Sequence, residues 1–314
     1  MDKHSKIYVA GHRGLVGSAI IRKLKTDGYS NIITRTSKEL DLRKQVEVGR
    51  FFAEEQPEYV FLAAAKVGGI LANSTFPGQF LYENLMIQTN VIEAARQVEV
   101  KKLLFLGSTC IYPKMAPQPL KEDYLLTGEL ESTNEAYAIA KIAGIKMCNA
   151  YNKEYRTNFI SVMPTNLYGP NDNFDLQSSH VLPALMRKIH EAKVNKESTV
   201  SVWGSGKPLR EFLHADDLAD ACTYLMEECD VIQVGEFVNI GMGKEVSIEQ
   251  LALLLCDVIG YEGKLVFDIS KPDGTPRKLT DVSKLHNLGW KHSIELKEGV
   301  QDAYNWYLDN VIKS

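Results

Sequence analysis

Residues 6–17, KIYVAGHRGLVG, decide the fold of this chain. The run KIYVA predicts a short strand, and three glycines follow it at GxxGxxG spacing, namely Gly11, Gly14 and Gly17. A helix is expected to begin at Leu15. A strand, a glycine-rich turn and a helix in this order can hold a pyrophosphate, because glycine permits the tight turn and the helix start presents free N–H groups. The stretch predicts a dinucleotide site, whereas in another context the glycines would mark only a flexible turn.

Short apolar strands alternate with longer helices through the first half of the chain. Strands are expected at residues 6–10, 31–34, 59–63, 103–106 and 159–163, and helices at 15–27, 44–55, 78–98 and 134–155. This βαβ alternation predicts the α/β class, with a Rossmann-type doubly wound parallel sheet.

The alternation changes after Pro164. Residues 167–179 are rich in Gly, Pro, Asn, Asp and Ser and are expected to form a loop. Further helices are expected at 181–192, 216–228, 247–259 and 295–310, and strands at 199–203, 237–240 and 264–267. We predict that residues 1–165, with segments near 212–240, form the cofactor-binding domain. Residues 166–211 and 241–314 would form a smaller C-terminal α/β substrate domain.

The composition excludes several classes of protein. The 36 basic and 40 acidic side chains leave a net charge of −4, which argues against nucleic-acid binding. The five cysteines are scattered and form no CxxC pair, so neither a disulfide framework nor a structural zinc site is expected. No signal peptide and no apolar run of about 20 residues is found. We therefore expect a cytoplasmic protein that binds no metal and no membrane.

The end of the second expected strand indicates which dinucleotide is bound. Enzymes that prefer NAD usually carry an acid there, whereas this chain has Arg35, Ser37 and Lys38. Arg13 lies inside the glycine loop, and cations of this kind suit a 2′-phosphate. NADP(H) is therefore the expected cofactor. Asp41, followed by Leu42, is placed for a contact on the adenine side, although a helix cap is an equal alternative for Asp41.

A tyrosine and a lysine are four residues apart on the helix expected at 134–155, so Tyr137 and Lys141 share one face. A nearby ammonium favours the phenolate and brings the tyrosine closer to a useful pKa. Ser108 follows the fourth strand and can donate to a carbonyl oxygen. Together with a nicotinamide, these three side chains predict hydride transfer with a proton relay. YxxxK alone is common on surface helices and is weak evidence. The prediction of hydride transfer depends on finding the motif downstream of the glycine loop.

The chain resembles the extended short-chain dehydrogenase/reductases over nearly its whole length. The resemblance is carried by AGHRGLVGSAI, AAAKVGGI, LGSTCIYPK, NEAYAIAKIAGIK, VMPTNLYGPNDNF, SSHVLPAL, VWGSGKPLREFLHADD and SKPDGTPRKL. Within that family, the chain is similar to enzymes that epimerise and then reduce a GDP-4-keto-6-deoxy-mannose. The resemblance therefore implies a small-molecule GDP-sugar as substrate.

The resemblance also implies two residues for epimerisation. A 4-keto group acidifies the hydrogens on C3 and C5, and inversion needs a base and an acid on opposite faces. Cys110 is implied as the base and His180 as the acid, roles that a thiolate and an imidazolium can fill. From the residues alone, Cys110 would more often be an inert buried thiol and His180 a surface residue at a helix start.

The resemblance further implies the residues that contact each ligand. Beside Arg35, Ser37, Lys38, Asp41 and Leu42, the cofactor set comprises Gly11, His12, Arg13, Gly14, Leu15, Val16, Gly17, Leu62, Ala63, Ala64, Leu106, Gly107, Tyr137, Lys141, Pro164, Asn166, Leu167 and His180. The substrate set comprises Ser108, Cys110, Asn166, Lys188, Trp203, Arg210 and Asp273. Arg210 suits the diphosphate. Trp203 could equally pack in a core, and Asp273 could merely form a turn.

Two alternative functions follow from the same sequence. A 4,6-dehydratase or 4-epimerase would share the fold, but related dehydratases carry Thr-Asp-Glu where this chain has Ser108-Thr109-Cys110, so no acid is available to eliminate water. A regulator without catalysis would be expected to lack Ser108, Tyr137 or Lys141.

The resemblance implies a homodimer in which the helices at 78–98 and 134–155 form a four-helix bundle with their copies. Otherwise, these helices cover only their own sheet.

Overall fold

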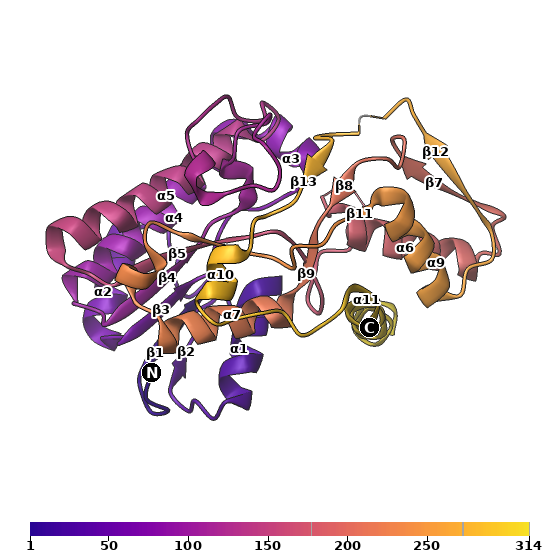
Figure 1. Ribbon diagram of the computed structural model, residues 1–314. Coiled ribbons are helices and arrows are strands. Elements are labelled where there is room, and N and C mark those ends of the chain that lie inside the picture. Colours follow the sequence, from indigo (N-terminus) through magenta and orange to yellow (C-terminus); the bar gives the residue numbers. More distant parts are fainter. Residues whose placement is uncertain (177, 272, 314) are drawn as a thin grey trace.

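The computed structural model describes residues 1–314 except 177, 272 and 314. The chain forms two lobes, and the larger one contains both the N-terminus and a six-stranded parallel sheet (Figure 1). In sheet order, the strands are β10 (Val238–Ile240), β5 (Phe159–Pro164), β4 (Lys102–Leu106), β3 (Tyr59–Leu62), β1 (Ile7–Ala10) and β2 (Ile32–Ile33). This arrangement confirms the predicted α/β class.

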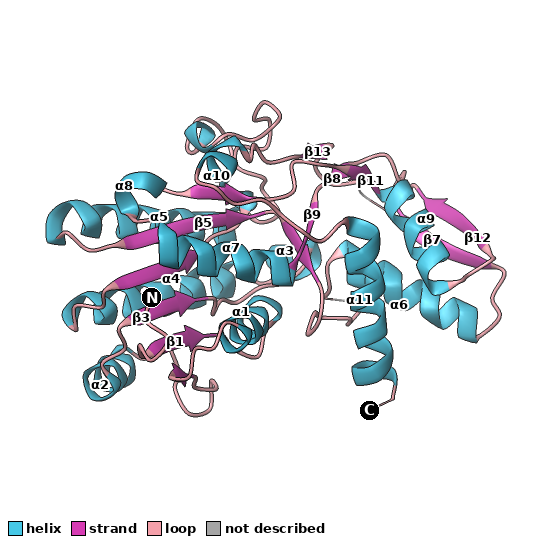
Figure 2. Ribbon diagram, turned by 60° about the horizontal axis from the view of Figure 1, so that its bottom comes forward, coloured by secondary structure: helices cyan, strands magenta, loops and turns pink. Residues whose placement is uncertain are grey.

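Helices cover both faces of the large sheet (Figure 2). One face carries α1 (Leu15–Thr26) and α7 (Ala215–Glu228), and the other carries α2 (Gln45–Glu55), α4 (Pro77–Gln97) and α5 (Glu135–Tyr155). Alternate strand residues serve the two cores, since Val9 packs with α1 while Tyr8 packs with α2. Both faces are therefore dry, which explains why these strands are apolar throughout.

The smaller lobe is built from short strands and three helices around a separate core. Its helices are α6 (Val181–Val194), α9 (Ile248–Ile259) and α11 (Leu296–Tyr307). Its sheets pair β7 (Thr199–Trp203) with β12 (Lys264–Asp268), and β8 (Leu209–Arg210) with both β11 (Val246–Ser247) and β13 (Arg277–Lys278). Strands β6 (Asn166–Tyr168) and β9 (Phe212–His214) pair where the two lobes meet.

The stretch at 167–179 was expected to be a loop, and this is partly wrong. Its first residues belong to β6, because the backbone of Asn166 and Tyr168 pairs with β9 more than forty residues further along the chain. Such a partner cannot be read from local turn-forming residues.

The chain crosses between the lobes more than once. Leu285 on α10 (Ser283–Asn287) and Trp290 just after it pack into the core of the larger lobe, although they lie within the expected substrate segment 241–314. The remaining short elements are α3 (Ile70–Thr75), α8 (Val231–Val234), η1 (Thr109–Ile111), η2 (Glu122–Tyr124) and η3 (Leu308–Ile312). In the described part of the chain, no helix has both the length and the apolar character needed to cross a membrane.

Candidate active site

The glycine loop joins β1 to α1 at the carboxyl end of the large sheet. Gly11 has φ +86°, and a Cβ there would lie 2.7 Å from the backbone nitrogen of Ala64. A Cβ on Gly17 would overlap the carbonyl oxygen of Gly11. No side chain caps α1 at Gly14, so the first-turn N–H groups at Leu15 and beyond stay free for an anion. The loop therefore has the backbone geometry of a pyrophosphate site.

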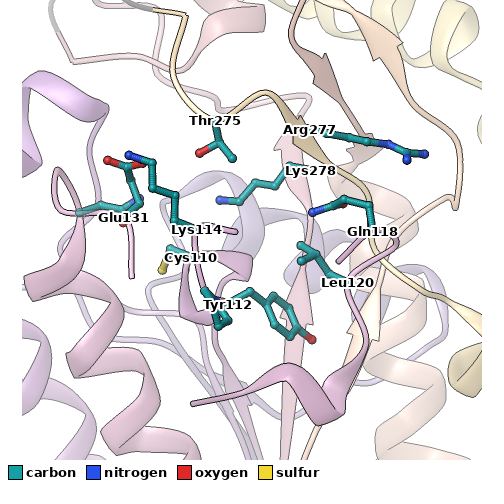
Figure 3. A pocket seen from close by; sticks show the side chains of 11 residues that line it. Cys110, Tyr112, Lys114, Gln118, Leu120, Glu131, Thr275, Arg277 and Lys278 are labelled. Atoms are coloured by element: carbon teal, nitrogen blue, oxygen red, sulfur yellow. The ribbon is translucent and has the colours of Figure 1, made fainter. Parts of the chain in front are cut away.

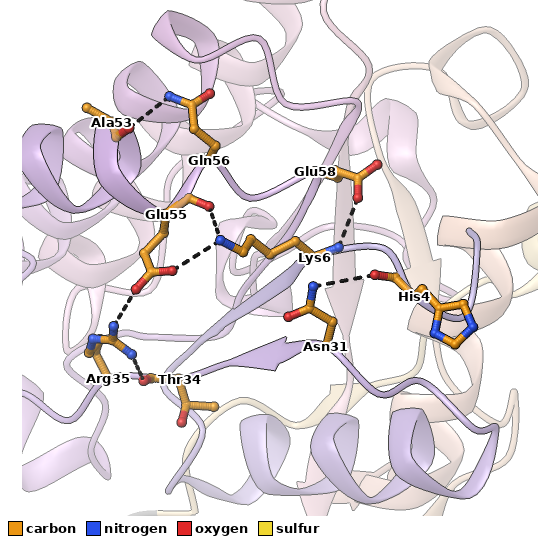
Figure 4. Close-up of polar contacts among 9 residues, drawn as sticks. All are labelled: His4, Lys6, Asn31, Thr34, Arg35, Ala53, Glu55, Gln56 and Glu58. Carbon is orange, nitrogen blue, oxygen red and sulfur yellow. Dashed lines mark hydrogen bonds and ion pairs between the residues drawn. The ribbon is translucent and has the colours of Figure 1, made fainter.

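Three cations were expected near the 2′-phosphate, and one of them is engaged elsewhere. The Nη2 atom of Arg35 lies 2.5 Å from Oε1 of Glu55, and Nη1 donates to the carbonyl oxygen of Thr34 at 2.9 Å (Figure 4). The exposed side chains of Arg13 and Lys38 form no ion pair or hydrogen bond with any described residue. Arg13 and Lys38 are therefore the cations available to a ligand.

Asp41 binds its neighbour Arg43. Its carboxylate accepts from the backbone N–H of Arg43 at 3.1 Å and from two guanidinium nitrogens at 2.9 Å, and these bonds lower the pKa of Asp41. Helix α2 starts at Gln45 with Lys44 as its cap residue, so the alternative role of Asp41 as a helix cap is wrong. The carbonyl oxygen of Leu42 accepts from Asn90 at 2.9 Å.

The segment after β3 lies directly against the glycine loop. The N–H of Ala63 donates to the carbonyl oxygen of Ala10 at 3.1 Å, and Ala64 is the backbone that Gly11 approaches. The expected cofactor residues Leu62, Ala63 and Ala64 are thus brought beside the loop.

Ser108, Tyr137 and Lys141 lie at the carboxyl end of β4. Ser108 caps η1, and its Oγ accepts from the N–H of Cys110 at 3.5 Å. Lys141 is buried on α5, where its Nζ donates to the carbonyl oxygen of Leu106 at 2.8 Å and lies 5.7 Å from the centre of the Tyr137 ring. The spacing of Tyr137 and Lys141 thus places both side chains on the face of α5 that meets β4.

The electrostatics of this pair differ from the expectation. Burial lowers the pKa of Lys141 to about 8, and burial raises the pKa of Tyr137, which the nearby Cys110 raises further. The phenolate is therefore not favoured, because the loss of hydration around Tyr137 and the nearby Cys110 both favour the neutral phenol. A neutral phenol is the form that donates a proton.

Cys110 is 7% exposed and lines a cavity between the lobes (Figure 3). The other lining residues are Tyr112, Pro113, Lys114, Gln118, Leu120, Glu131, Asn134, Thr275, Arg277 and Lys278. Burial raises the pKa of the Cys110 thiol, while Lys278, the Ser108 hydroxyl and Lys141 act in the opposite direction. Cys110 thus borders a cavity whose lining includes the cationic side chains of Lys114, Arg277 and Lys278.

His180 is the exposed cap residue at the start of α6. Partial desolvation and the charge of Lys278 lower the pKa of His180.

Asn166, the expected contact for both ligands, donates to the carbonyl oxygen of Glu211 at 2.8 Å. Pro164 ends β5, and Leu167 lies in β6.

The expected substrate residues lie in the smaller lobe. Trp203 is 56% exposed at the end of β7, so its alternative role in a core is wrong. The Nζ of Lys188 lies 4.8 Å from the Trp203 ring centre. Arg210 is half-buried on β8, and burial lowers its pKa. Asp273 accepts from the N–H and the hydroxyl of Ser205 at 2.6 and 2.8 Å, so its carboxylate ties two loops together.

Sequence reasoning gave no role to Lys278 or Glu211, although both lie inside stretches that carried the resemblance. Glu211 is fully buried and accepts from Gly243 and Thr280. The chemistry of each residue depends on contacts with distant parts of the chain, and no local pattern marks them.

One group of described residues brings three metal-ligating atoms together, namely His214, Asp216 and Asp302. Asp216 already forms an ion pair with Arg22 at 2.5 Å, and Asp302 lies 3.3 Å from the imidazole of His214. Asp216 and Asp302 are thus each already close to a basic side chain.

Comparison with known proteins identifies relatives over the whole chain. A protein-family model described as the NAD dependent epimerase/dehydratase family matches residues 7–241. GDP-L-fucose synthase 1 of Arabidopsis thaliana is 61% identical over 310 residues, which cover 99% of this chain and 95% of that protein.

Two solved structures show the same fold with NADP bound. A GDP-mannoheptose C4 reductase from Campylobacter jejuni has 43% identity and a TM-score of 0.91, with 98% of this chain and 99% of that chain covered. A GDP-L-fucose synthetase from Naegleria fowleri has 31% identity and a TM-score of 0.92, with 100% and 96% covered.

Proposed function

Because the chain belongs to the NAD dependent epimerase/dehydratase family, among the extended short-chain dehydrogenase/reductases, we propose that it converts GDP-4-dehydro-6-deoxy-D-mannose to GDP-L-fucose. The activity combines 3,5-epimerisation with NADPH-dependent reduction at C4. The observation that carries the proposal is the meeting of Cys110, Tyr137 and Lys141 at the carboxyl end of β4, beside the glycine loop. That end of a parallel sheet is where α/β folds bind ligands.

The cofactor site fits NADPH in two respects. The Gly11 and Gly17 positions leave room only for backbone, so the pyrophosphate meets the free N–H groups of α1. Arg13 and Lys38 supply the positive charge for the 2′-phosphate. When bound, NADPH supplies the hydride that reduces C4.

Epimerisation uses the residues around the cavity. The Cys110 thiolate removes the proton from C3 or C5, and the electron pair moves onto the C4 carbonyl oxygen. His180, as the imidazolium, returns a proton to the opposite face of the same carbon. The support for these roles is the position of Cys110 on the cavity and the shared proximity of both residues to Lys278.

Reduction uses the residues on α5. As C4 gains hydride, its oxygen becomes an alkoxide, and Tyr137 donates the proton that neutralises it. The raised pKa of Tyr137 suits this role, because the phenol stays protonated until the alkoxide forms. Ser108 donates a hydrogen bond to the same oxygen. Lys188, Trp203, Arg210 and Asp273 form the nucleotide side of the site.

Incubation with NADPH and GDP-4-dehydro-6-deoxy-D-mannose in heavy water tests the proposal. The expected result is oxidation of NADPH, formation of GDP-L-fucose and deuterium at C3 and C5. C4 reduction is the activity named for the Campylobacter relative, and a chain with that activity alone would oxidise NADPH without deuterium uptake. NADPH binding with no turnover would instead indicate a regulator, and either result would overturn the proposal.

We propose in addition that two copies associate through α4 and α5. These helices pack against each other, and Phe76, Tyr82 and Ile139 leave large apolar surfaces exposed beside or on them. Sedimentation over a concentration series is expected to give about twice the 35.2 kDa mass, and Tyr82→Glu is expected to lower it. Ile232→Glu, at an even more exposed apolar position on α8, is the control. A monomer at every concentration would contradict the dimer.

The proposed location is the cytoplasm. The five cysteines are all free thiols, which suits a reducing compartment, and NADPH is available there. Cell fractionation with an antibody against the chain tests this, and recovery in an oxidising compartment would contradict it.

A further inference from the structure

We propose that Lys278 makes Cys110 a usable base: its ammonium group, carried into the site by the smaller lobe, stabilises the Cys110 thiolate. The inference rests on the proposed function, in which Cys110 removes the proton. The inference gives Lys278, on β13, a role in activating the base, which the sequence alone did not predict.

Cys110 and Lys278 reach one cavity from opposite lobes. Cys110 lies on η1, directly after β4 of the larger lobe, and Lys278 ends β13 of the smaller lobe. Both line the same cavity, and the amine end of Lys278 extends toward the side where Cys110 lies (Figure 3). The cavity therefore brings a thiol and an amine together only when the lobes are packed.

The backbone that carries Lys278 is held in place from both sides. Lys278 pairs with Arg210 in the parallel β8–β13 ladder. Two residues further on, Thr280 donates to the buried carboxylate of Glu211 through its N–H at 2.9 Å and its hydroxyl at 2.6 Å. Thr280 also forms a β-bridge with Leu120. The amine is thus presented from a fixed strand rather than from a mobile loop.

Lys278 differs from the other cations that line the cavity. Lys114 is paired with Glu131 at 3.0 Å, and Arg277 is paired with Glu245 at 2.7 Å. Lys278 forms no hydrogen bond or ion pair within the described ranges 1–176, 178–271 and 273–313. Its charge is therefore not neutralised by a carboxylate and remains available to the thiolate.

Burial opposes charge on both groups, whereas the thiol and the amine each favour the charged form of the other. Lys278, the Ser108 hydroxyl and Lys141 lower the pKa of Cys110 against the larger effect of burial. For Lys278 itself, burial and Arg210 lower the pKa, while Cys110 and Glu131 raise it. Lys278 also lowers the pKa of His180, so one cation supports the base and makes the acid a stronger proton donor.

The test is the rate at which iodoacetamide alkylates Cys110 as a function of pH, followed by peptide mass spectrometry on the full chain without substrate. The thiolate is the reacting form, so the rate reports the pKa of Cys110. Lys278→Met is expected to move the profile to higher pH and to slow alkylation at neutral pH about tenfold, the change for one pKa unit. Lys278→Arg, which keeps the charge, is expected to restore part of the rate.

Lys114→Met is the matched control, because it removes a lysine from the same cavity whose charge Glu131 already neutralises. Its alkylation profile is expected to match that of the unmodified chain. NADPH binding shows whether each variant is folded. If the Lys278→Met variant does not fold, Lys278→Gln replaces it. An unchanged profile in a folded, uncharged Lys278 variant would overturn the inference.

The result of the alkylation experiment can be distinguished from the result of the turnover experiment that tests the proposed function. Alkylation needs no sugar, so a shifted profile in a chain that does not turn over the GDP-sugar would refute the proposed function alone. If Lys278 served only to bind the diphosphate, Lys278→Met would raise KM and leave alkylation unchanged. We expect instead that deuterium uptake at C3 and C5 falls about tenfold through kcat.

Discussion

Lys141 donates its hydrogen bond to the carbonyl oxygen of Leu106, not to the tyrosine four residues before it. The bond joins α5 to the end of β4 and fixes where the amine lies. Tyr137 packs edge-on against Phe80, with ring centres 6.4 Å apart. Tyr137 is therefore a partly exposed neutral acid whose ring centre lies 5.7 Å from the amine of the buried Lys141. Because the amine is fixed by β4 and not by the tyrosine, a change at Tyr137 can remove the acid and leave the rest of the site in place.

Tyr137→Phe is expected to abolish reduction while epimerisation continues. General acid catalysis typically contributes about 10²–10⁴-fold, so NADPH oxidation should fall at least 100-fold. Deuterium uptake at C3 and C5, measured by mass spectrometry of the recovered sugar, should persist. Loss of both signals would show that Tyr137 has a structural role instead.

Cys110→Ser is expected to abolish epimerisation, the half-reaction that Tyr137→Phe leaves intact. A serine hydroxyl does not ionise near neutral pH, so deuterium uptake at both carbons should fall by roughly 100-fold or more. Cys256→Ser is the control, because that thiol lies on α9 in the smaller lobe and is more exposed. Normal uptake in the Cys110 variant would mean that another group is the base.

Arg13→Ala is expected to weaken the preference for NADPH over NADH. A hydrogen bond to a charged group contributes about 1.5–3 kcal/mol, so the ratio of kcat/KM values should fall roughly 10- to 100-fold. Arg35→Ala is expected to change the ratio less, because Glu55 already holds that guanidinium. Equal effects of the two variants, or none in Arg13→Ala, would refute this assignment.

Asp172, on the loop before His180, is expected to make stability fall as pH rises. Burial raises its pKa to about 7, and no described group donates to its buried Oδ2. Between the unfolded value near 3.8 and about 7, the native chain binds more protons than the unfolded chain, so unfolding becomes easier as pH increases.

Asp172→Asn removes this titration and keeps an oxygen for the N–H of Asn173. The variant should melt at least about 2 °C higher than the unmodified chain at pH 8, and at the same temperature at pH 4. Differential scanning calorimetry measures both, and a gain that is equal at the two pH values would contradict the titration.

The sequence predicted the large sheet well because its strands are buried on both faces. Residues 59–62 form a continuous apolar run, and such runs appear only where helices cover both sides. Tyr137 and Lys141 were also predictable, because helical spacing alone places them on one face.

The rest of the site depends on long-range pairing. Strands β8 and β13 have two residues each, too few for a periodic signal, and their partners lie far along the chain. The pKa of Tyr137 was predicted in the wrong direction because the depth of its burial is set by tertiary packing. Arg35 and Glu55 are likewise joined by the fold and not by local sequence.

The residues of the candidate site are made at different times during synthesis. The glycine loop, Ser108, Tyr137 and Lys141 all precede residue 165, whereas Lys278 emerges from the ribosome more than a hundred residues later. A nascent or prematurely terminated chain can therefore form its dinucleotide cradle before the charge of Lys278 reaches the Cys110 thiol. Proton abstraction is delayed until the last segments fold back, and a chain that ends before β13 lacks the cation that activates Cys110.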